Sequence, residues 1–284
     1  MLKRFTTLSP QKNMLFLSFL LPLFVMMVIY ATMGVYPFGN STLLTVDLGQ
    51  QYVDFFSYYR TTLLSDPSAL FFSFSKSFGC DMLGLCAYYL MSPFNLIFLL
   101  FPQSQLPLAV TILILMKVSA SGLTFAHLLI SRFEGKGLLV PSFAVSYALM
   151  GYVIVNQLNV MWLDGLVFLP LIILGLEKLL SGESGLYYSL FLAVMLLSNY
   201  YIGFMICVFL VFYYLFAFSR QELVSTNNLK AQLKHFFTQS ARFIGYSLLG
   251  AGFAAVLLLP TFYSLLESKA SYANKLIDWR FAYD

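Results

Sequence analysis

The chain of 284 residues is 60% hydrophobic and only 10% charged. Soluble domains carry about 25% charged residues, so this chain has too few polar side chains to cover a water-soluble fold. Its aromatic content of 18% excludes intrinsic disorder, and its 17 glycines and 3 cysteines exclude collagen-like and disulfide-rich proteins. The net charge of +4 is too small and too scattered to indicate nucleic-acid binding. The composition predicts an all-α polytopic integral membrane protein that uses lipid as its solvent.

Apolar runs along the chain predict about seven transmembrane helices, since about 20 mostly apolar residues cross the hydrocarbon of a bilayer. We expect them at residues 14–34, 106–130, 138–155, 160–176, 186–198, 202–218 and 243–266. The first run is interpreted as an uncleaved signal-anchor, because it is longer than the apolar region of a signal peptide and no small-residue cleavage site follows it. The run 186–218 is too long for one span, and Asn199 to Gly203 divide it into two helices joined by a tight turn.

The distribution of Lys and Arg predicts a cytoplasmic N-terminus. With seven spans, ten of these residues lie on the cytoplasmic side, five lie outside, and Lys117 lies within a span. A further span at 83–101 would invert the later loops and place six inside and nine outside. The eight apolar residues between Pro93 and Pro102 are too few to cross a bilayer. We therefore expect a short re-entrant or interfacial segment there, within one large extracytoplasmic loop, 35–105.

This large loop contains a predicted amphipathic helix that begins near Leu48. Apolar side chains recur at helical spacing, at Leu48, Tyr52, Phe55, Tyr59 and Leu63. A polar stripe beside them consists of Gln50, Asp54, Ser57 and Thr61. We expect this helix to lie along the outer membrane surface, as helices with one apolar and one polar face do.

Asp47 immediately precedes this helix and supports two interpretations. The spacing Asp47-x-x-Gln50 resembles a capping box, in which Asp47 accepts hydrogen bonds from free N–H groups at the helix start. Alternatively, Asp47 is a carboxylate at the membrane face that acts as a general base or binds a divalent cation such as Mg²⁺ or Mn²⁺. The two roles are compatible, because a capping carboxylate keeps free lone pairs.

Two charged residues are predicted within the spans, where a charge usually faces a cavity or a partner. Asp164 lies about one turn inside the fourth span, on the same side as Asp47; alternatively, it is an interfacial residue beside an anchoring Trp162. Lys117 lies near the middle of the second span and needs a carboxylate, backbone carbonyls, water or a bound anion. It therefore predicts either an internal ion pair or a site for a substrate, an ion or a phosphate.

The remaining polar groups are less specific. Asn199 and Tyr200 mark the outer turn between the fifth and sixth spans, and they suit either an interfacial turn or a sugar-binding site. Cys80 and Cys86 lie in the outer loop, where a disulfide and free thiols are both compatible with the sequence. No CxxC pair or His cluster indicates zinc, and no Walker A, GxSxG or GxGxxG motif indicates nucleotide or serine hydrolysis.

Several stretches spread over the chain resemble the YfhO family of bacterial membrane proteins. They are Asp47-Leu48-Gly49-Gln50-Gln51-Tyr52 with Asp54-Phe55-Phe56, Met161-Trp162-Leu163-Asp164-Gly165 with Leu169-Pro170-Leu171 and Glu177-Lys178, and Asn199-Tyr200-Tyr201-Ile202-Gly203-Phe204-Met205. The family is similar to GT-C glycosyltransferases, which are polytopic enzymes with an acidic residue in the first outer loop and a polyprenyl-phosphate sugar as donor. Its members are implicated in glycosylating teichoic acids, including lipoteichoic acid, on the outer face of Gram-positive bacteria. They are longer than this chain, so the resemblance implies that residues 1–284 are a single transmembrane domain, the N-terminal portion of a longer protein.

The resemblance also implies roles for individual residues. Asp47 would deprotonate the acceptor hydroxyl or orient a divalent metal, and Asp164 would be the second acid near the site. Lys117 is the candidate contact to the donor phosphate. The other candidate substrate contacts are Gln50, Gln51, Tyr52, Asn199 and Tyr200. The implied reaction is an inverting transfer from a lipid-linked sugar donor to an envelope polymer at the cell membrane.

A multi-spanning transporter or lipid flippase is the alternative function. Lys117 near the membrane midplane and the broken run at Asn199 both fit a binding site built from discontinuous helices. A transferase should place Asp47 and Asp164 around one outward-facing cavity, whereas a transporter should line a midplane path with Lys117. A third alternative, a non-catalytic assembly partner, predicts that Asp47 can be lost without consequence.

Overall fold

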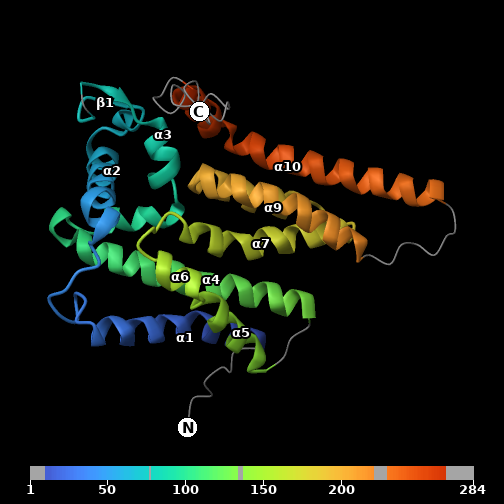
Figure 1. Ribbon diagram of the computed structural model, residues 1–284, viewed down its shortest axis with the longest axis horizontal. Helices are drawn as coiled ribbons and strands as arrows, with labels where there is room; N and C mark the ends of the chain where they lie inside the picture. Colours follow the sequence, from blue (N-terminus) through green and yellow to red (C-terminus); the bar gives the residue numbers. More distant parts are fainter. Residues whose placement is uncertain (1–9, 77, 134–136, 221–228, 267–284) are drawn as a thin grey trace, which may run out of the picture.

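The computed structural model describes residues 10–76, 78–133, 137–220 and 229–266. Long helices run side by side along one direction, and several short elements gather at one end of them (Figure 1). The long helices are α1 (Pro10–Thr32), α4 (Leu106–Phe133), α7 (Leu163–Leu180), α9 (Tyr200–Ser219) and α10 (Leu229–Leu266), and the shorter α5 (Leu139–Ala148) and α8 (Leu186–Ser198) pack with them. These helices confirm the predicted all-α architecture.

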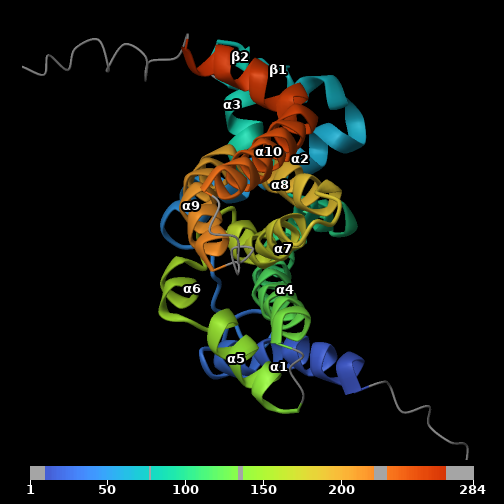
Figure 2. The same ribbon diagram turned by 90° about the vertical axis from the view of Figure 1, so that its right-hand side faces the viewer.

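These helices pack as a row. α1 contacts α4, α4 contacts α7, α7 contacts α8, and α8 contacts α10, while α5 lies against both α1 and α4. Figure 2, which looks along the helices, shows this succession from α1 to α10, with α9 beside α7 and α8. The neighbours approach closely where glycine faces backbone: a side chain at Gly122 would meet the carbonyl oxygen of Ser18, and one at Gly175 would meet the backbone of Tyr188. Small residues at such contacts are typical of helices that pack within a membrane.

The short elements lie between α1 and α4, with one more before α7. They are the π-helical turn η1 (Leu48–Tyr52), α2 (Val53–Ser65), η2 (Pro67–Leu70), β1 (Phe72–Ser73), β2 (Cys80–Asp81), α3 (Leu83–Leu85), η3 (Cys86–Leu90), η4 (Pro93–Leu100), η5 (Gln103–Gln105) and α6 (Gly151–Asn156). The two strands are antiparallel, with Phe72 opposite Asp81 and Ser73 opposite Cys80. The three cysteines, Cys80, Cys86 and Cys207, are free thiols.

Within the described residues, five helices are long and apolar enough to cross a membrane, and the bent pair formed by Leu83–Leu90 (α3 with η3) and η4 would be a sixth. Each predicted span corresponds to helical structure, although 138–155 is divided between α5 and α6. α7 has 18 residues and carries Asp164, Glu177 and Lys178, and α8 has only 13 residues. The chain is therefore a polytopic membrane protein, and the count of seven spans remains a prediction.

The segment before α4 turns sharply instead of crossing as one straight helix. The helices Leu83–Leu90 and Pro93–Leu100 meet at a bend of 88°. Pro93 follows the bend, and proline disfavours helical geometry in the residue before it. Ser92 is accordingly extended, and its side chain caps η4 by accepting a hydrogen bond from the Phe94 N–H. This geometry agrees with the expected re-entrant or interfacial segment.

α2 crosses the end of the bundle instead of running along it (Figure 1). The predicted stripe was right at Leu48, Tyr52 and Tyr59, which are buried, but Phe56 and Thr62 are buried where Phe55 and Leu63 were expected. Phe55 and Leu63 are partly buried, and they belong to the same side of the helix, because positions three and four residues apart share one helical face. Phe56 stacks on Phe98 of η4 with ring centroids 4.4 Å apart, so α2 packs on protein along this face.

A polar contact joins α4, α7 and α9 at the opposite end of the bundle. Arg132 lies 3.0 Å from the Glu177 carboxylate, and the Tyr213 hydroxyl donates a hydrogen bond to the same carboxylate. Both charged side chains are partly exposed, and such pairs contribute about 0–1 kcal/mol. This contact fixes helix positions at the end away from α2.

Candidate functional site

Asp47 lies in the turn that leads from α1 to α2, at the end of the bundle. Val46 before it has a left-handed backbone with φ of 49°, and Gly49 after it packs so closely on the Leu44 backbone that a Cβ atom would overlap the Leu44 carbonyl. The backbone of Asp47 is already helical, and the Gly49 N–H bonds to the Thr45 carbonyl. A capping side chain requires extended backbone, so Asp47 makes no capping hydrogen bond and the predicted capping box is wrong.

The carboxylate of Asp47 is exposed and faces a buried tyrosine. The Tyr52 hydroxyl lies 3.4 Å from Asp47 Oδ2 and 3.2 Å from Asn159 Oδ1, and it can donate its single proton to one of them at a time. Burial raises the pKa of Tyr52, and the neighbouring Tyr89 and Asp47 add to this effect. Tyr52 therefore remains a protonated donor. Because it offers Asp47 at most one hydrogen bond, most of the lone pairs of the Asp47 carboxylate stay open to a ligand.

Tyrosine rings from separate parts of the chain pack together beside this pair. The Tyr52 ring lies 5.2 Å from that of Tyr89, and Tyr88 contacts Tyr89 at 4.6 Å and Tyr200 at 5.8 Å. The Trp162 indole N–H donates to the Tyr88 hydroxyl at 3.1 Å. We call Tyr52, Tyr88, Tyr89, Trp162 and Tyr200 the aromatic cluster. It unites η1, η3, the turn before α7 and the start of α9.

Asn199 fixes the α9 side of the aromatic cluster. It is the one residue between α8 and α9, it is fully buried, and its extended backbone ends one helix and starts the next. Its side-chain oxygen accepts from the Ile202 N–H at 2.8 Å, and its amide donates to the Tyr88 carbonyl at 2.8 Å. The predicted tight turn is confirmed, and Asn199 holds Tyr88 and Tyr200 together. Gln50 and Gln51, on the turn that follows Asp47, are exposed.

Lys117 and Asp164 form an ion pair with a separation of 2.8 Å, and both side chains are completely buried. The lysine also donates to the Val160 carbonyl at 2.9 Å, and the Ser92 hydroxyl donates to the second carboxylate oxygen at 2.8 Å. Asp164 is the second residue of α7, in its first turn, and it is fully buried instead of reaching water beside Trp162. Of the partners that the sequence left open for Lys117, the structure shows an internal carboxylate, Asp164.

The ion pair and Asp47 do not contact one another directly. They are linked through adjacent residues of the turn before α7, because Asn159 contacts Tyr52 while Val160 contacts Lys117. Asp47 is exposed and Asp164 is enclosed. A transferase was expected to place Asp47 and Asp164 around one open cavity. The two acids do not line one open cavity in this structure.

A metal site is not formed by the described residues alone. Within the described residues, no group of three or more His, Cys, Asp or Glu side chains could hold a metal ion. Asp47 could supply one ligand to a divalent cation, and the cation would need its other ligands from elsewhere.

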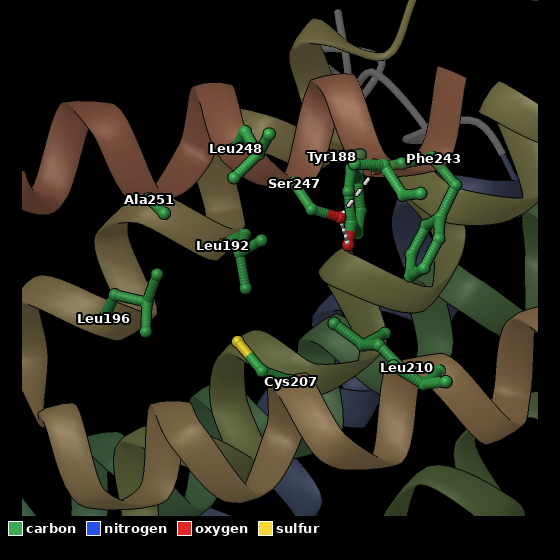
Figure 3. Close-up of a pocket in the computed structure, with 11 residues that line it drawn as sticks. Tyr188, Leu192, Leu196, Cys207, Leu210, Phe243, Ser247, Leu248 and Ala251 are labelled. Atoms are coloured by element: carbon green, nitrogen blue, oxygen red, sulfur yellow. Dashed lines mark hydrogen bonds between the residues drawn. The ribbon is translucent and has the colours of Figure 1, made fainter. Parts of the chain in front are cut away.

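Apolar cavities open between helices in the described part of the chain. One of about 270 Å³ lies among α8, α9 and α10, where Leu192 and Cys207 line it and Tyr188 shares a 2.8 Å hydrogen bond with Ser247 (Figure 3). Another, of about 550 Å³, lies beside η4 and is lined by Pro93, Phe94, Leu96, Ile97, Leu100, Met116 and Phe168. The Phe94 ring also lies 5.7 Å from the Lys117 ammonium. The second cavity therefore adjoins the ion pair.

Sequence reasoning missed three residues of this region. Asn159 belongs to the polar run Asn156-Gln157-Leu158-Asn159 between two apolar runs, which is a signal for a polar turn near the membrane. Tyr88 and Tyr89 are adjacent tyrosines within an apolar stretch, and nothing in their spacing indicated Tyr52 as a partner. Their contacts depend on the bend at Ser92 and on the turn at Asn199.

Comparison with known proteins identifies the family of the chain. The family described as "Bacterial membrane protein YfhO" matches residues 18–284, a range that includes Asp47, the aromatic cluster and the Lys117–Asp164 ion pair. No curated protein and no solved structure matches the chain. The chain therefore belongs to the YfhO family of bacterial membrane proteins.

Proposed function

We propose that this chain carries the acceptor-activating site of a membrane glycosyltransferase. The enzyme would move a sugar from a polyprenyl-phosphate donor to a hydroxyl of a cell-envelope polymer such as teichoic acid. The observation that carries the proposal is the Asp47 carboxylate, which is exposed beside the aromatic cluster and accepts one long hydrogen bond, from Tyr52, within the described residues. Such a carboxylate is free to take a proton from an acceptor.

The proposed step is a single displacement at the anomeric carbon. Asp47 removes the proton of the acceptor hydroxyl as that oxygen bonds to the sugar. The bond between the sugar and the phosphate oxygen breaks, and polyprenyl phosphate leaves with the electron pair. The configuration of the sugar is inverted. Tyr52, held near Asp47 by its hydroxyl, keeps the carboxylate in place, and the rings of the aromatic cluster offer faces and hydroxyls to a sugar.

In this proposal, the first isoprene units of the donor's lipid tail lie in the apolar cavity beside η4. That cavity lies next to the ion pair, whereas the cavity of Figure 3 lies among α8, α9 and α10. In this proposal Asp164 and Lys117 have a structural role, because each already has the other as its charged partner. The pair holds the turn before α7 in place through the Val160 carbonyl. A divalent cation on Asp47 would need ligands beyond the described residues, so no step of the proposal is assigned to a metal.

A transporter or flippase receives less support. It would use Lys117 as a midplane binding group that exchanges its contacts with cargo. The lysine side chain is instead enclosed and bonded to Asp164 and to the Val160 carbonyl. The two functions are separated by one assay in proteoliposomes that contain a labelled polyprenyl-phosphate sugar and a teichoic acid acceptor. Label that becomes covalently attached to the polymer supports transfer, and label that only changes leaflet supports transport.

Replacing Tyr52 by Phe should slow sugar transfer by about tenfold, the lower end for a lost hydrogen bond to a charged group. The variant keeps the buried ring and removes the hydroxyl that contacts Asp47. The readout is the transfer rate at saturating donor. Tyr59→Phe, which removes a buried hydroxyl from the neighbouring helix, should leave the rate within about twofold, since it breaks no contact to Asp47. Equal rates for both variants would remove Tyr52 from the proposed site.

Asp47 is expected to face the outside of the cell, because the Lys and Arg distribution favours a cytoplasmic N-terminus. Ser75 and Ser184 are exposed, and they lie in the β1–β2 and α7–α8 connections, which are at opposite ends of the bundle (Figure 1). Single cysteines at these positions report the orientation after Cys80, Cys86 and Cys207 are replaced. A membrane-impermeant maleimide should label position 75 in intact cells and position 184 only after permeabilisation. The reverse pattern would place the proposed site in the cytoplasm.

A further inference from the structure

α10 is longer than a membrane crossing requires. Its 38 residues extend for about 57 Å, whereas the hydrocarbon of a bilayer is about 30 Å thick. The part from Phe243 to Leu266 has 24 residues, contains no charged side chain and is long enough to cross. The first part of the helix, Leu229–Arg242, therefore extends beyond the hydrocarbon. We call it the basic segment, because it carries Lys230, Lys234 and Arg242 and no Asp or Glu.

One side of the basic segment packs on the end of α9. The Phe218 ring lies 5.6 Å from that of His235 and 5.3 Å from that of Phe236, and the Tyr214 and Ser240 hydroxyls share a 2.8 Å hydrogen bond. These contacts fix the rotation of the helix. They determine which of its side chains face away from the protein.

The other side presents an apolar stripe next to a cationic one. Leu229, Leu233 and Phe237 recur every fourth residue and are 67%, 47% and 65% exposed. Lys230 and Lys234 each follow one of them by one position, so the two stripes run side by side. Lys234 and Phe237 also line one open groove of about 690 Å³. Arg242 lines the same groove, and it donates a hydrogen bond to the Glu183 carbonyl at 2.6 Å.

We infer that the basic segment binds anionic phospholipid headgroups at the membrane surface opposite to Asp47. Lysines directly beside a membrane-crossing helix are attracted to anionic headgroups, by about 1 kcal/mol for each lysine near the surface. Lysines extend from such positions to the headgroup phosphates. The site lies at the end of α10 away from α2 (Figure 1), so it is separate from the proposed transfer site and does not depend on it.

The test is a lipid titration of the purified full chain in detergent. A polarity-sensitive fluorophore is placed at Phe237→Cys after Cys80, Cys86 and Cys207 are replaced by Ser. Phosphatidylglycerol should bind more tightly than phosphatidylcholine, and high salt should weaken the difference. The Kd for phosphatidylglycerol should rise roughly fivefold for each lysine removed in Lys230→Gln/Lys234→Gln.

The matched control is Arg60→Gln/Lys76→Gln, which removes the same charge at the other end of the bundle. It should leave the Kd for phosphatidylglycerol unchanged. Equal affinity for the two lipids, or an equal effect of the control pair, would overturn the inference. A second measurement uses the labelled protein in bilayers whose lipids carry a quencher on the headgroup. Quenching at position 237 is expected, and a label shielded from lipid would show that a protein surface covers the stripe instead.

Discussion

Asp47→Asn is expected to fold and insert normally and to lose sugar transfer by about 10²–10⁴-fold, the usual contribution of a general base. Asparagine has the same shape, and its oxygen can still accept the hydrogen bond from Tyr52. Asp47 makes no capping hydrogen bond, so the substitution removes no support of η1. What it removes is the negative charge and the basicity. The measurement is the rate of transfer from a polyprenyl-phosphate sugar to a teichoic acid acceptor by the full-length protein.

Asp54→Asn is the matched control for this prediction. Asp54 is exposed in the first turn of α2, a short distance along the same helical segment, and its loss changes the net charge equally. It should reduce transfer far less than Asp47→Asn does. Near-normal turnover by Asp47→Asn, with normal expression, would eliminate the base role and favour a non-catalytic assembly partner.

Lys117→Met alone is expected to destabilise the protein by roughly 3–5 kcal/mol, the usual cost of removing one partner of a buried ion pair. The variant leaves the Asp164 carboxylate enclosed without its cation and removes a donor from the Val160 carbonyl. Asp164→Leu should be destabilising for the corresponding reason. The double variant Lys117→Met/Asp164→Leu should recover most of this loss, because an apolar pair needs no charge partner. The measurement is the free energy of unfolding in mixed micelles.

Lys178→Met provides the control for the lysine substitution. Lys178 is partly exposed near the other end of α7 and lies over the Tyr187 ring, so the same change should destabilise the protein by about 1 kcal/mol or less. A double variant as unstable as the sum of the single variants would show that the two charges act independently. The double variant also tests the phosphate role of Lys117. Normal donor binding by this folded protein would assign the lysine to support of the site, and lost donor binding would assign it to the phosphate.

The helical architecture could be predicted from the sequence because it follows from local physics. A long apolar run in lipid must satisfy its own backbone hydrogen bonds, so it forms a helix whatever its neighbours are. The helix breaks at Pro93 and at Asn199 could also be predicted from the sequence, since these residues act on the backbone within a few positions. The capping box failed for a local reason as well. The turn at Val46 and Gly49 starts the helix before Asp47, and no spacing rule contains that turn.

The sequence by itself thus determined the membrane class, the helices and the break near Pro93, and it singled out Asp47, Asp164 and Lys117 as unusual charges. Only the tertiary structure decided their partners. Lys117 and Asp164 are 47 positions apart, and Tyr52 and Asn159 are 107 apart. Pairing over such distances depends on how α4 packs against α7 and how η3 folds against α9. Packing is set by side-chain shape and close backbone approach summed over many contacts, which no short pattern in the sequence encodes.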